Sequence, residues 1–356
     1  MLQSNIFENV VFVGIDYKVP RGGIASVLNT YSTFIHPFKF VRTTAGELNG
    51  VQKYWYAASG YVLLIWKLLT DSSIEIVHIH SASGSSFWRK SIAIKIAKSM
   101  GKKVIFHCHG GGFKEFRDSS PAKVDAILNK VDSVVCLSSE WKTYFESIGC
   151  KNVVIIKNVI VEPEIATTES DGLVHFLFLG LICDNKGIFD SLEAIAKHKD
   201  ELLGKVILHI GGNGQTERLT ERINELGLEQ LVRFEGWVNK EKKRHLLNLA
   251  DVYILPSYIE GVPISILEAE SYHKPVITTN VGGIPSIVRN NETGLFVTPG
   301  NQDEIYQSIK TLTDDEALRK RLGEAGYEIS KGYLPETIKQ GLENLYSNIL
   351  NDNALR

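Results

Sequence analysis

The chain has 356 residues, of which 44% are hydrophobic and 22% charged, and its formal net charge is −2 at pH 7. This length and composition indicate a globular protein of about two domains, and the nearly balanced charge argues against a nucleic-acid-binding protein. The four cysteines are not spaced as C-x-x-C pairs, which favours reduced thiols in a cytoplasmic protein over a disulfide framework. Residues 1–10 contain neither a basic segment nor a long apolar run, so we expect no signal peptide.

The first predicted strand, Val10–Ile15, is a short apolar run that leads through Gly22 and Gly23 into a helical pattern over residues 24–34. Two glycines between a strand and a helix let the backbone approach a ligand closely, and the start of the helix offers free amide groups. On spacing alone, an ordinary tight turn is the simpler interpretation.

Residues 54–69 form an aromatic and apolar segment, with Lys53 and Lys67 near its ends. The segment is shorter than the ~20 residues that a membrane-spanning helix needs. We expect a helix that is packed inside the N-terminal half of the protein. The alternative is a surface helix that touches a membrane, with three aromatic side chains at the interface: Trp55, Tyr61 and Trp66.

Two histidine-rich strands are predicted next, over residues 74–80 and 104–109. Ligands collect beyond the carboxyl ends of strands in a parallel α/β sheet, and His80 and His109 both lie at such ends. Four histidines in this region invite a zinc interpretation, but no carboxylate or cysteine stands at metal-site spacing. We therefore predict no metal site, and a structural role is the common one for such histidines.

Strands and helices continue to alternate through the rest of the chain, and this alternation predicts an α/β fold with two doubly wound parallel sheets. An acidic, unpatterned linker at residues 163–172 separates the two halves. Gly212 lies in a G-G-x-G turn that does not complete a dinucleotide-binding fingerprint. Further strands are expected at residues 131–138, 153–157, 173–180, 205–210, 232–238 and 251–256, and amphipathic helices at residues 302–312, 315–330 and 335–350.

The most informative stretch is residues 257–270, which follows the strand at 251–256. Gly261 and Pro263 indicate a strand-to-helix turn, and Pro263 suits the first turn of a helix, where its missing amide is not needed. The start of that helix is a ready anion site. Glu260 stands just before it and Glu268 lies inside the helix, and carboxylates accept hydrogen bonds from hydroxyl groups. Amide groups that bind phosphate, next to carboxylates that bind hydroxyl groups, are suited to a nucleotide sugar.

Several motifs surround this stretch in a fixed order: E-G-x-P at 260–263, E-A at 268–269, K-P-V at 274–276 and G-G-x-P at 282–285. Together they resemble the E-x7-E region of the retaining glycosyltransferases of family 4, which have the GT-B fold. The resemblance covers most of the chain and is strongest over residues 173–300. It implies two Rossmann-like domains facing a cleft: an acceptor-side domain at 1–165, a nucleotide-sugar-binding domain at 166–334, and a C-terminal helix at 335–356 that packs back on the first domain.

The resemblance also implies roles for individual residues. His109, in the loop H-x-H-G-G-G-F, faces the reacting sugar, Lys186 meets the diphosphate, and Glu260 holds the sugar ring; these three are the catalytic candidates. No metal or other cofactor is expected, because helix amides and Lys186 stabilise the leaving diphosphate. The residues expected to bind the nucleotide sugar are Gly22, Gly23, Lys186, Gly212, Val238, Glu260, Gly261, Val262, Pro263, Ile264 and Glu268, the last of these at the ribose.

The chain departs from the family pattern at two places. Leu181 stands where the family has an arginine that binds phosphate, and loss of such a cation removes leaving-group stabilisation on the order of 3 kcal/mol. Arg21 and Arg289 are candidates to replace it. Residues 158–159 are Asn-Val where the family usually has Asn-Gly, so the hinge differs in detail.

The implied function is retaining transfer of a hexose-type sugar from a nucleoside diphosphate sugar to a hydroxyl acceptor, in bacterial polysaccharide or glycoconjugate synthesis. The acceptor is a saccharide or a lipid-linked saccharide, and the protein is expected in the cytoplasm or, with peripheral membrane contact, at the inner face of the membrane. Two other classes stay open. A nucleotide-sugar epimerase would convert the donor without an acceptor, and a non-catalytic binder of nucleotide sugars is favoured by the leucine at position 181.

Overall fold

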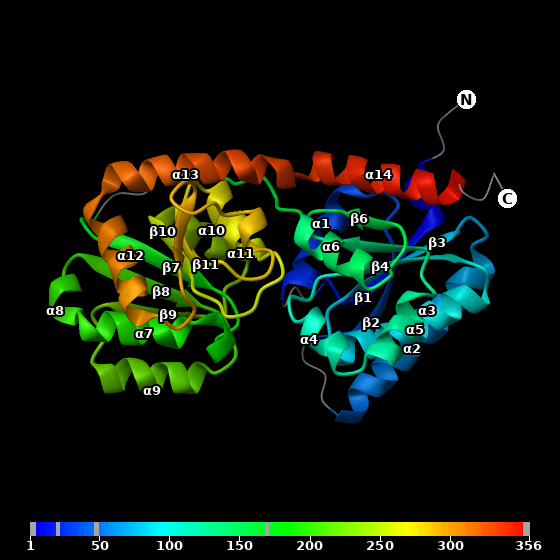
Figure 1. Cartoon of the computed structure of the whole chain (residues 1–356), viewed down its shortest axis with the longest axis horizontal. Helices are drawn as coiled ribbons and strands as arrows, with labels where there is room; N and C mark the ends of the chain where they lie inside the picture. Colours follow the sequence, from blue (N-terminus) through cyan, green and yellow to red (C-terminus); the bar gives the residue numbers. More distant parts are fainter. Residues whose placement is uncertain (1–4, 19–21, 46–49, 168–170, 352–356) are drawn as a thin grey trace. The chain divides into compact units, whose positions relative to one another are not determined.

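The computed structural model describes residues 5–18, 22–45, 50–167 and 171–351. The chain divides into two compact units (Figure 1): the first comprises Met1–Ile160 together with Tyr333–Arg356, and the second comprises Val161–Gly332. Each unit has one six-stranded parallel sheet with helices on both of its faces. The predicted pair of doubly wound parallel sheets is therefore confirmed.

The sheet of unit 1 has the strand order β2-β1-β3-β4-β5-β6. Its central strands are buried on both faces, as covered parallel strands must be, and this explains their continuous apolar runs. The strands are β1 (Val10–Ile15), β2 (Lys39–Thr44), β3 (Ile76–Ser81), β4 (Lys103–Cys108), β5 (Ser133–Cys136) and β6 (Val153–Ile155). The helices are α1 (Gly23–Phe34), α2 (Gly50–Thr70), α3 (Ser85–Ser99), α4 (Phe113–Asp118), α5 (Pro121–Leu128), α6 (Ser139–Ser147) and α14 (Pro335–Asn351), after the 3-10 turn η1 (Ile6–Asn9).

The last helix, α14, belongs to unit 1 although it follows unit 2 in the sequence. It packs on α1 and η1, and Tyr346 makes a 2.7 Å hydrogen bond through its hydroxyl to Nδ1 of His78 on β3. Where the chain leaves and re-enters unit 1, the Ile160 amide donates to the Tyr333 carbonyl at 3.0 Å. The predicted return of the C-terminal helix to the N-terminal sheet is confirmed.

The sheet of unit 2 has the strand order β12-β11-β10-β7-β8-β9. Helices α11 and α13 pack together, as do α7 with α9 and α12. The strands are β7 (Val174–Leu179), β8 (Val206–Gly211), β9 (Val232–Gly236), β10 (Val252–Leu255), β11 (Val276–Thr279) and β12 (Gly294–Val297). The helices are α7 (Ile188–Lys197), α8 (Lys199–Leu202), α9 (Thr216–Leu226), α10 (Lys240–Leu249), α11 (Ile264–Ser271), α12 (Gln302–Asp314) and α13 (Glu316–Ser330), with 3-10 turns η2 (Asp184–Lys186) and η3 (Ile284–Ser286).

The strand order of unit 2 reverses between β7 and β10, which lie side by side in the sheet. The Tyr253 hydroxyl on β10 donates to the Leu179 carbonyl at the end of β7, at 2.9 Å. The loops that leave these two strands therefore start next to each other and then turn to opposite faces of the sheet. Ligands of open α/β sheets bind in the crevice at such a point.

Two expectations about unit 1 need correction. Residues 39–44 form an edge strand, β2, that the sequence pattern did not predict, because its lysine, arginine and threonines suggest a loop. The helix over residues 54–69, α2, is not packed inside the unit. Leu64 and Leu68 are buried, but Trp55 and Trp66 are exposed, because α2 covers the outer edge of the sheet and buries one face only. Among the described residues, no helix combines the length and apolarity needed to cross a bilayer.

Candidate active site

The loop from β10 to α11 ends at a helix start that has no side-chain cap. Pro263 is the N-cap residue, and α11 begins at Ile264, so Pro263 stands one residue earlier than the predicted place in the first turn. The first turn of α11 also contains no acidic residue. Its amide groups and the positive end of the helix dipole are therefore available to an anion.

Glu260 lies just before this helix start, and only 8% of it is exposed. Its Oε1 atom accepts a hydrogen bond from the Ser257 hydroxyl at 3.0 Å. The same atom forms an ion pair with the ammonium of Lys186. The backbone of Gly282 lies against the Glu260 carbonyl with a φ of +55°, where any Cβ atom would overlap that oxygen. The G-G-x-P turn after β11 thus fixes the backbone of Glu260.

Lys186 reaches Glu260 from the loop after β7, the neighbouring strand at the reversal point. It ends the 3-10 turn η2, and Gly187 follows in the left-handed conformation, where a Cβ atom would overlap the Pro256 carbonyl. The Tyr258 amide donates to the Asn185 carbonyl at 2.9 Å, which ties the two loops together. The structure therefore brings together two of the predicted catalytic residues, a cation and a carboxylate, beside the free helix start.

Glu268 lies one further turn into the helix and also has a lysine partner. Lys243 on α10 places its Nζ atom 2.5 Å from Glu268 Oε1. The sequence interpretation missed Lys243, because it is one of several basic residues in a helix and their spacing does not show which one points toward the site. Each glutamate of the E-x7-E stretch is thus paired with a lysine.

Gly212 and Val238 lie at the ends of the next two strands. The Gly212 amide donates to the Gly236 carbonyl at 2.9 Å, and a Cβ atom on Gly212 would overlap the Gly180 carbonyl. The Val238 side chain lies directly against Gly211, where a Cβ atom would meet its Cγ2 at 2.5 Å. The carboxyl ends of β7, β8 and β9 therefore converge closely, with these two residues next to the loop that carries Lys186.

Leu181 stands where the family has an arginine, and its side chain is exposed in the loop after β7. Of the two candidate replacements, Arg21 lies outside the described residues, and Arg289 is exposed and 3.5 Å from Glu292. The structure adds Arg218, which donates to Asp184 at 2.8 Å and lies 4.0 Å above the Phe189 ring. Arg218 is near the turn of Lys186, but a carboxylate already holds it.

The remaining predicted residues are in unit 1. Gly22 has a φ of +90° and is the N-cap of α1. Among the described residues, none lies within 4 Å of a Cβ atom added to Gly22, so its backbone is open toward them. His109 follows β4, and its amide donates to the Ser81 carbonyl at 2.8 Å. Its Nε2 atom lies 2.9 Å from Nδ1 of His80.

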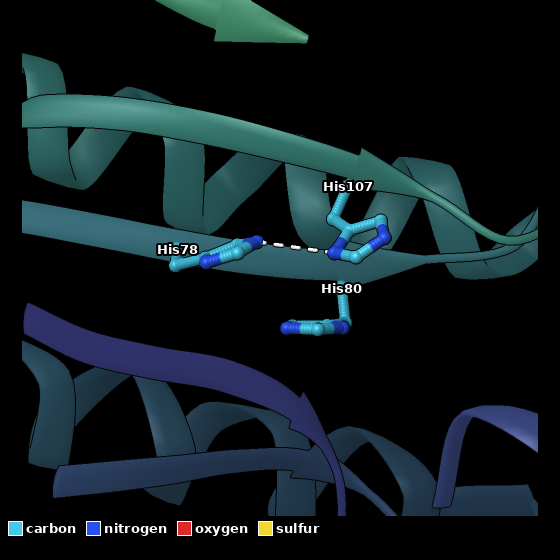
Figure 2. A group of neighbouring side chains, drawn as sticks. All are labelled: His78, His80 and His107. Atoms are coloured by element: carbon cyan, nitrogen blue, oxygen red, sulfur yellow. Dashed lines mark hydrogen bonds between the residues drawn. The ribbon is translucent and has the colours of Figure 1, made fainter. Parts of the chain in front are cut away.

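His109 is the end of a stack of four histidines on β3 and β4. Ring centroids are 4.6 Å apart for His78 and His80, 4.6 Å for His80 and His107, and 4.2 Å for His107 and His109. Figure 2 shows the first three, with His78 Nε2 and His107 Nδ1 3.2 Å apart. Burial lowers the pKa of His78 and of His109 to about 3, an effect that a hydrogen bond to the Asn158 side chain opposes at His109. Burial also holds the pKa of His80 and of His107 well below the usual range, so the stack is neutral.

The histidine stack brings three residues of a metal-ligating type close together. Ring nitrogens of His78, His80 and His107 lie within 4.8 Å of one another. However, the His78 and His80 rings are only 21° from parallel, so their in-plane lone pairs do not converge on one point. Four of their ring nitrogens already make hydrogen bonds: His78 Nδ1 with Tyr346, His78 Nε2 with His107 Nδ1, and His80 Nδ1 with His109. The arrangement is that of a hydrogen-bonded stack of rings rather than that of ligands around a tetrahedrally coordinated metal ion.

Unit 2 thus has one lysine–glutamate pair at the uncapped start of α11 and a second pair about one turn further along the helix. Comparison with protein families identifies the class of protein. The model of glycosyltransferase family 4 matches residues 31–161, and the model of group 1 glycosyl transferases matches residues 162–329. The chain belongs to the group 1, family 4 glycosyltransferases, enzymes that transfer a sugar from a nucleotide sugar.

Individual relatives agree with this assignment. An uncharacterized glycosyltransferase of Methanocaldococcus jannaschii is 26% identical over 289 residues, which are 79% of this chain and 78% of that protein. The lipopolysaccharide core biosynthesis glycosyltransferase LpsE of Rhizobium meliloti is 28% identical over 231 residues, which are 62% of this chain and 66% of that protein. The chain thus aligns with about two thirds of LpsE.

Solved structures share the fold over nearly the whole chain. Sucrose-phosphate synthase from Thermosynechococcus elongatus has a TM-score of 0.80 at 18% identity, covering 96% of this chain and 99% of that one. The Anabaena protein HepE in complex with UDP has a TM-score of 0.76 at 16% identity, covering 96% of this chain and 100% of that one. HepE has also been solved with UDP-glucose.

Proposed function

We propose that this enzyme transfers a hexose, with retention of anomeric configuration, from a uridine diphosphate sugar to a hydroxyl group of a saccharide or lipid-linked saccharide, in bacterial polysaccharide or glycoconjugate synthesis. The observation that carries the proposal is the contact of Lys186 with Glu260 beside the uncapped start of α11. The donor base is suggested by the UDP and UDP-glucose complexes of HepE. The acceptor class is suggested by the lipopolysaccharide core enzyme.

In the proposed mechanism, the residues of unit 2 hold the donor. The α11 amides and Lys186 take the diphosphate, Glu260 accepts hydrogen bonds from the sugar hydroxyls, and Glu268 accepts them from the ribose. Val238 and Gly212 line the nucleotide end of the site. In this proposal the donor domain expected at residues 166–334 corresponds to unit 2, Val161–Gly332, and the acceptor side expected at residues 1–165 and 335–356 corresponds to unit 1.

The chemical step breaks the bond between the anomeric carbon and the phosphate oxygen. The acceptor oxygen bonds to the same carbon on the same face, and its proton passes to the leaving phosphate. Lys186 and the helix amides stabilise the negative charge that develops on the diphosphate. We assign to His109, which burial keeps neutral, a hydrogen bond to the reacting sugar, and to Gly22 and Gly23 a contact with the diphosphate.

The proposal is tested by calorimetric titration with UDP, GDP and ADP sugars, followed by turnover with and without saccharide acceptors and with and without EDTA. We expect the uridine sugar to bind most tightly and the product to keep the donor's anomeric configuration by NMR, with activity surviving EDTA. Interconversion of the donor without an acceptor would support the epimerase alternative. Tight binding with no turnover on any acceptor would support the non-catalytic binder.

A further inference from the structure

Lys243 and Glu268 form an ion pair between two helices of unit 2. Lys243 lies on α10 and Glu268 on α11, and the Lys243 Nζ atom is 2.5 Å from Glu268 Oε1. The exposed fractions of the two side chains are 31% and 20%, so solvent reaches only part of the pair. Burial raises the pKa of the Tyr253 hydroxyl, and the carboxylates of Glu268 and Glu260 add to this effect. Both glutamates therefore lie near the point where the strand order reverses, since Tyr253 bonds there to the end of β7.

Helix α10 directs Lys243 inward rather than toward solvent. The ammonium of the preceding residue, Lys242, lies 2.8 Å from Glu235 on β9, which ties the first turn of the helix to the sheet. Positions three and four residues apart share one face of a helix, and Leu246 and Leu247, which follow Lys243 at these spacings, are buried. Lys243 is therefore on the core-facing side of α10, where a lysine needs a partner.

The carboxylate of Glu268 keeps one oxygen for a ligand. Lys243 occupies Oε1, and no hydrogen bond reaches Oε2 from the part of the chain that the structure describes. An ionised carboxylate can accept about four hydrogen bonds. Ribose hydroxyls are neutral donors, so they can bind to Glu268 without displacing Lys243. The pair of Lys186 with Glu260 differs, because a diphosphate requires the ammonium of Lys186 for itself.

We propose that Lys243 is a positioning residue that makes the donor site selective for ribose. The terminal torsion of a glutamate side chain is broad, so an unpaired carboxylate samples many orientations. The bond from Lys243 to Oε1 fixes the plane of the Glu268 carboxylate and leaves Oε2 to the ligand. An acceptor that is already fixed loses less entropy on binding than a mobile one. This role rests on the proposed function, in which Glu268 binds the ribose, and adds the residue that holds Glu268 in place.

Calorimetric titrations with UDP and with 2′,3′-dideoxy-UDP measure the selectivity directly, because the two nucleotides differ only in the ribose hydroxyls. Lys243→Met removes the charge but keeps an unbranched side chain, and Lys243→Arg keeps the charge. Arg244→Met is the matched control, because Arg244 is the next residue of α10 and pairs with the exposed Glu164 instead. Glu268→Ala completes the set. Circular dichroism and Tm confirm that each variant is folded, and Lys243→Gln replaces Lys243→Met if the latter does not fold.

We expect the wild type and Arg244→Met to bind UDP at least about tenfold more tightly than dideoxy-UDP, because the analogue lacks hydrogen bonds to a charged group. In Lys243→Met, UDP binding should weaken about tenfold and dideoxy-UDP binding by less than about threefold, so the selectivity falls. Lys243→Arg should restore the selectivity to within about threefold of the wild type, since it again donates to the carboxylate. In donor turnover, Lys243→Met should raise KM about tenfold and change kcat by less than about threefold, because the ribose contact is the same in the ground and transition states.

Adding Lys243→Met to Glu268→Ala should change UDP affinity by less than about twofold, because a positioning residue has nothing to act on once the carboxylate is gone. An equal loss for both nucleotides in Lys243→Met would overturn the proposal, since the lysine would then act through its charge alone. Tighter UDP binding in that variant would also overturn it, because Lys243 would then compete with the ribose.

The same titrations separate this role from the proposed function. Unchanged selectivity in Lys243→Met, together with lost selectivity in Glu268→Ala, would refute the positioning role and leave the ribose role of Glu268 intact. Full selectivity in Glu268→Ala, or a wild type that does not distinguish the two nucleotides, would refute the ribose role and the positioning role with it.

Discussion

The contact between Lys186 and Glu260 leads to a prediction about how the two halves of the donor contribute to binding. In the free enzyme the Lys186 ammonium is held by a nearly buried carboxylate. When a diphosphate arrives, the same ammonium must donate to phosphate oxygens. Glu260 therefore competes with the diphosphate for Lys186. At the same time it strengthens binding of the sugar, because it accepts hydrogen bonds from the sugar hydroxyls. The change Glu260→Gln removes the competing charge but keeps a hydrogen-bonding side chain of the same size.

The size of the effect follows from the geometry. A hydrogen bond to a charged group contributes about 1.5–3 kcal/mol, and the Lys186 side chain is 24% exposed, so solvent screens part of the ion pair. We expect UDP alone to bind Glu260→Gln as tightly as the wild type or up to about tenfold more tightly, since tenfold equals about 1.4 kcal/mol. The extra affinity that the sugar gives to UDP-sugar should disappear. Turnover should fall about 100-fold, because sugar placement matters most in the transition state.

The assay combines calorimetric titration of UDP and UDP-sugar with steady-state transfer or donor hydrolysis. Ser257→Ala is the matched control, because the Ser257 hydroxyl contacts the same carboxylate oxygen but carries no charge. UDP affinity should change by less than about threefold, because Glu260 keeps the charge that competes for Lys186; the lost bond, between a buried hydroxyl and a carboxylate, should instead lower the stability of the folded protein. If Glu260→Gln weakened UDP as much as UDP-sugar, or left turnover unchanged, the assignment of Glu260 to the sugar would be wrong.

Three further outcomes are expected. Glu268→Ala should weaken binding of UDP, and of UDP-sugar equally, by roughly 1–3 kcal/mol in the same titrations; unchanged affinity in a folded variant would contradict the ribose role. Leu181→Arg should raise donor turnover by up to about tenfold, because Arg218 is already held by a carboxylate; a flat or lower rate would show that another cation has taken over. The pKa of His78 is about 3 in the folded protein, below the ~6.5 of an unfolded histidine, so the unfolded chain binds the proton first and stability falls as pH drops from 6.5 toward 3. At pH 5 this histidine alone lowers the free energy of unfolding by about 2 kcal/mol. Urea titrations at pH 7.5 and pH 5 should therefore show a smaller loss of unfolding free energy between the two pH values for His78→Leu than for the wild type. An equal loss in both proteins would refute the neutral stack.

The sequence predicted the elements of the site better than their contacts. The apolar run at 251–256, the Gly261 and Pro263 turn and the E-x7-E spacing identified a strand, a loop and a helix start, which the structure has. The pairing of Lys186 with Glu260 joins residues 74 positions apart and follows from the order of the strands in the sheet, which local patterns do not encode. The same holds for Lys243 and Glu268, on separate helices.

Burial was predicted least well where the pattern is most apolar. Residues 54–69 are rich in Trp, Tyr and Leu, and such a segment normally packs in a core. Whether a helix is covered on one side or two depends on its place at the edge of the sheet, and β2, the strand that defines this edge, is polar enough to escape detection. Period two correctly put His107 and His109 on one face, but their partners in the stack, His78 and His80, come from another strand.

The return of α14 makes unit 1 discontinuous, and this affects the order in which the protein is made. The Tyr346 hydroxyl that pairs with His78 lies 268 residues further along the chain. A ribosome therefore releases all of unit 2 before it supplies the last helix of unit 1. Until then the part of β3 that Tyr346 contacts has no partner from α14, whereas all the residues of unit 2 have already been made. The Ile160–Tyr333 hydrogen bond, which joins the two parts of unit 1, cannot form until residue 333 has been made.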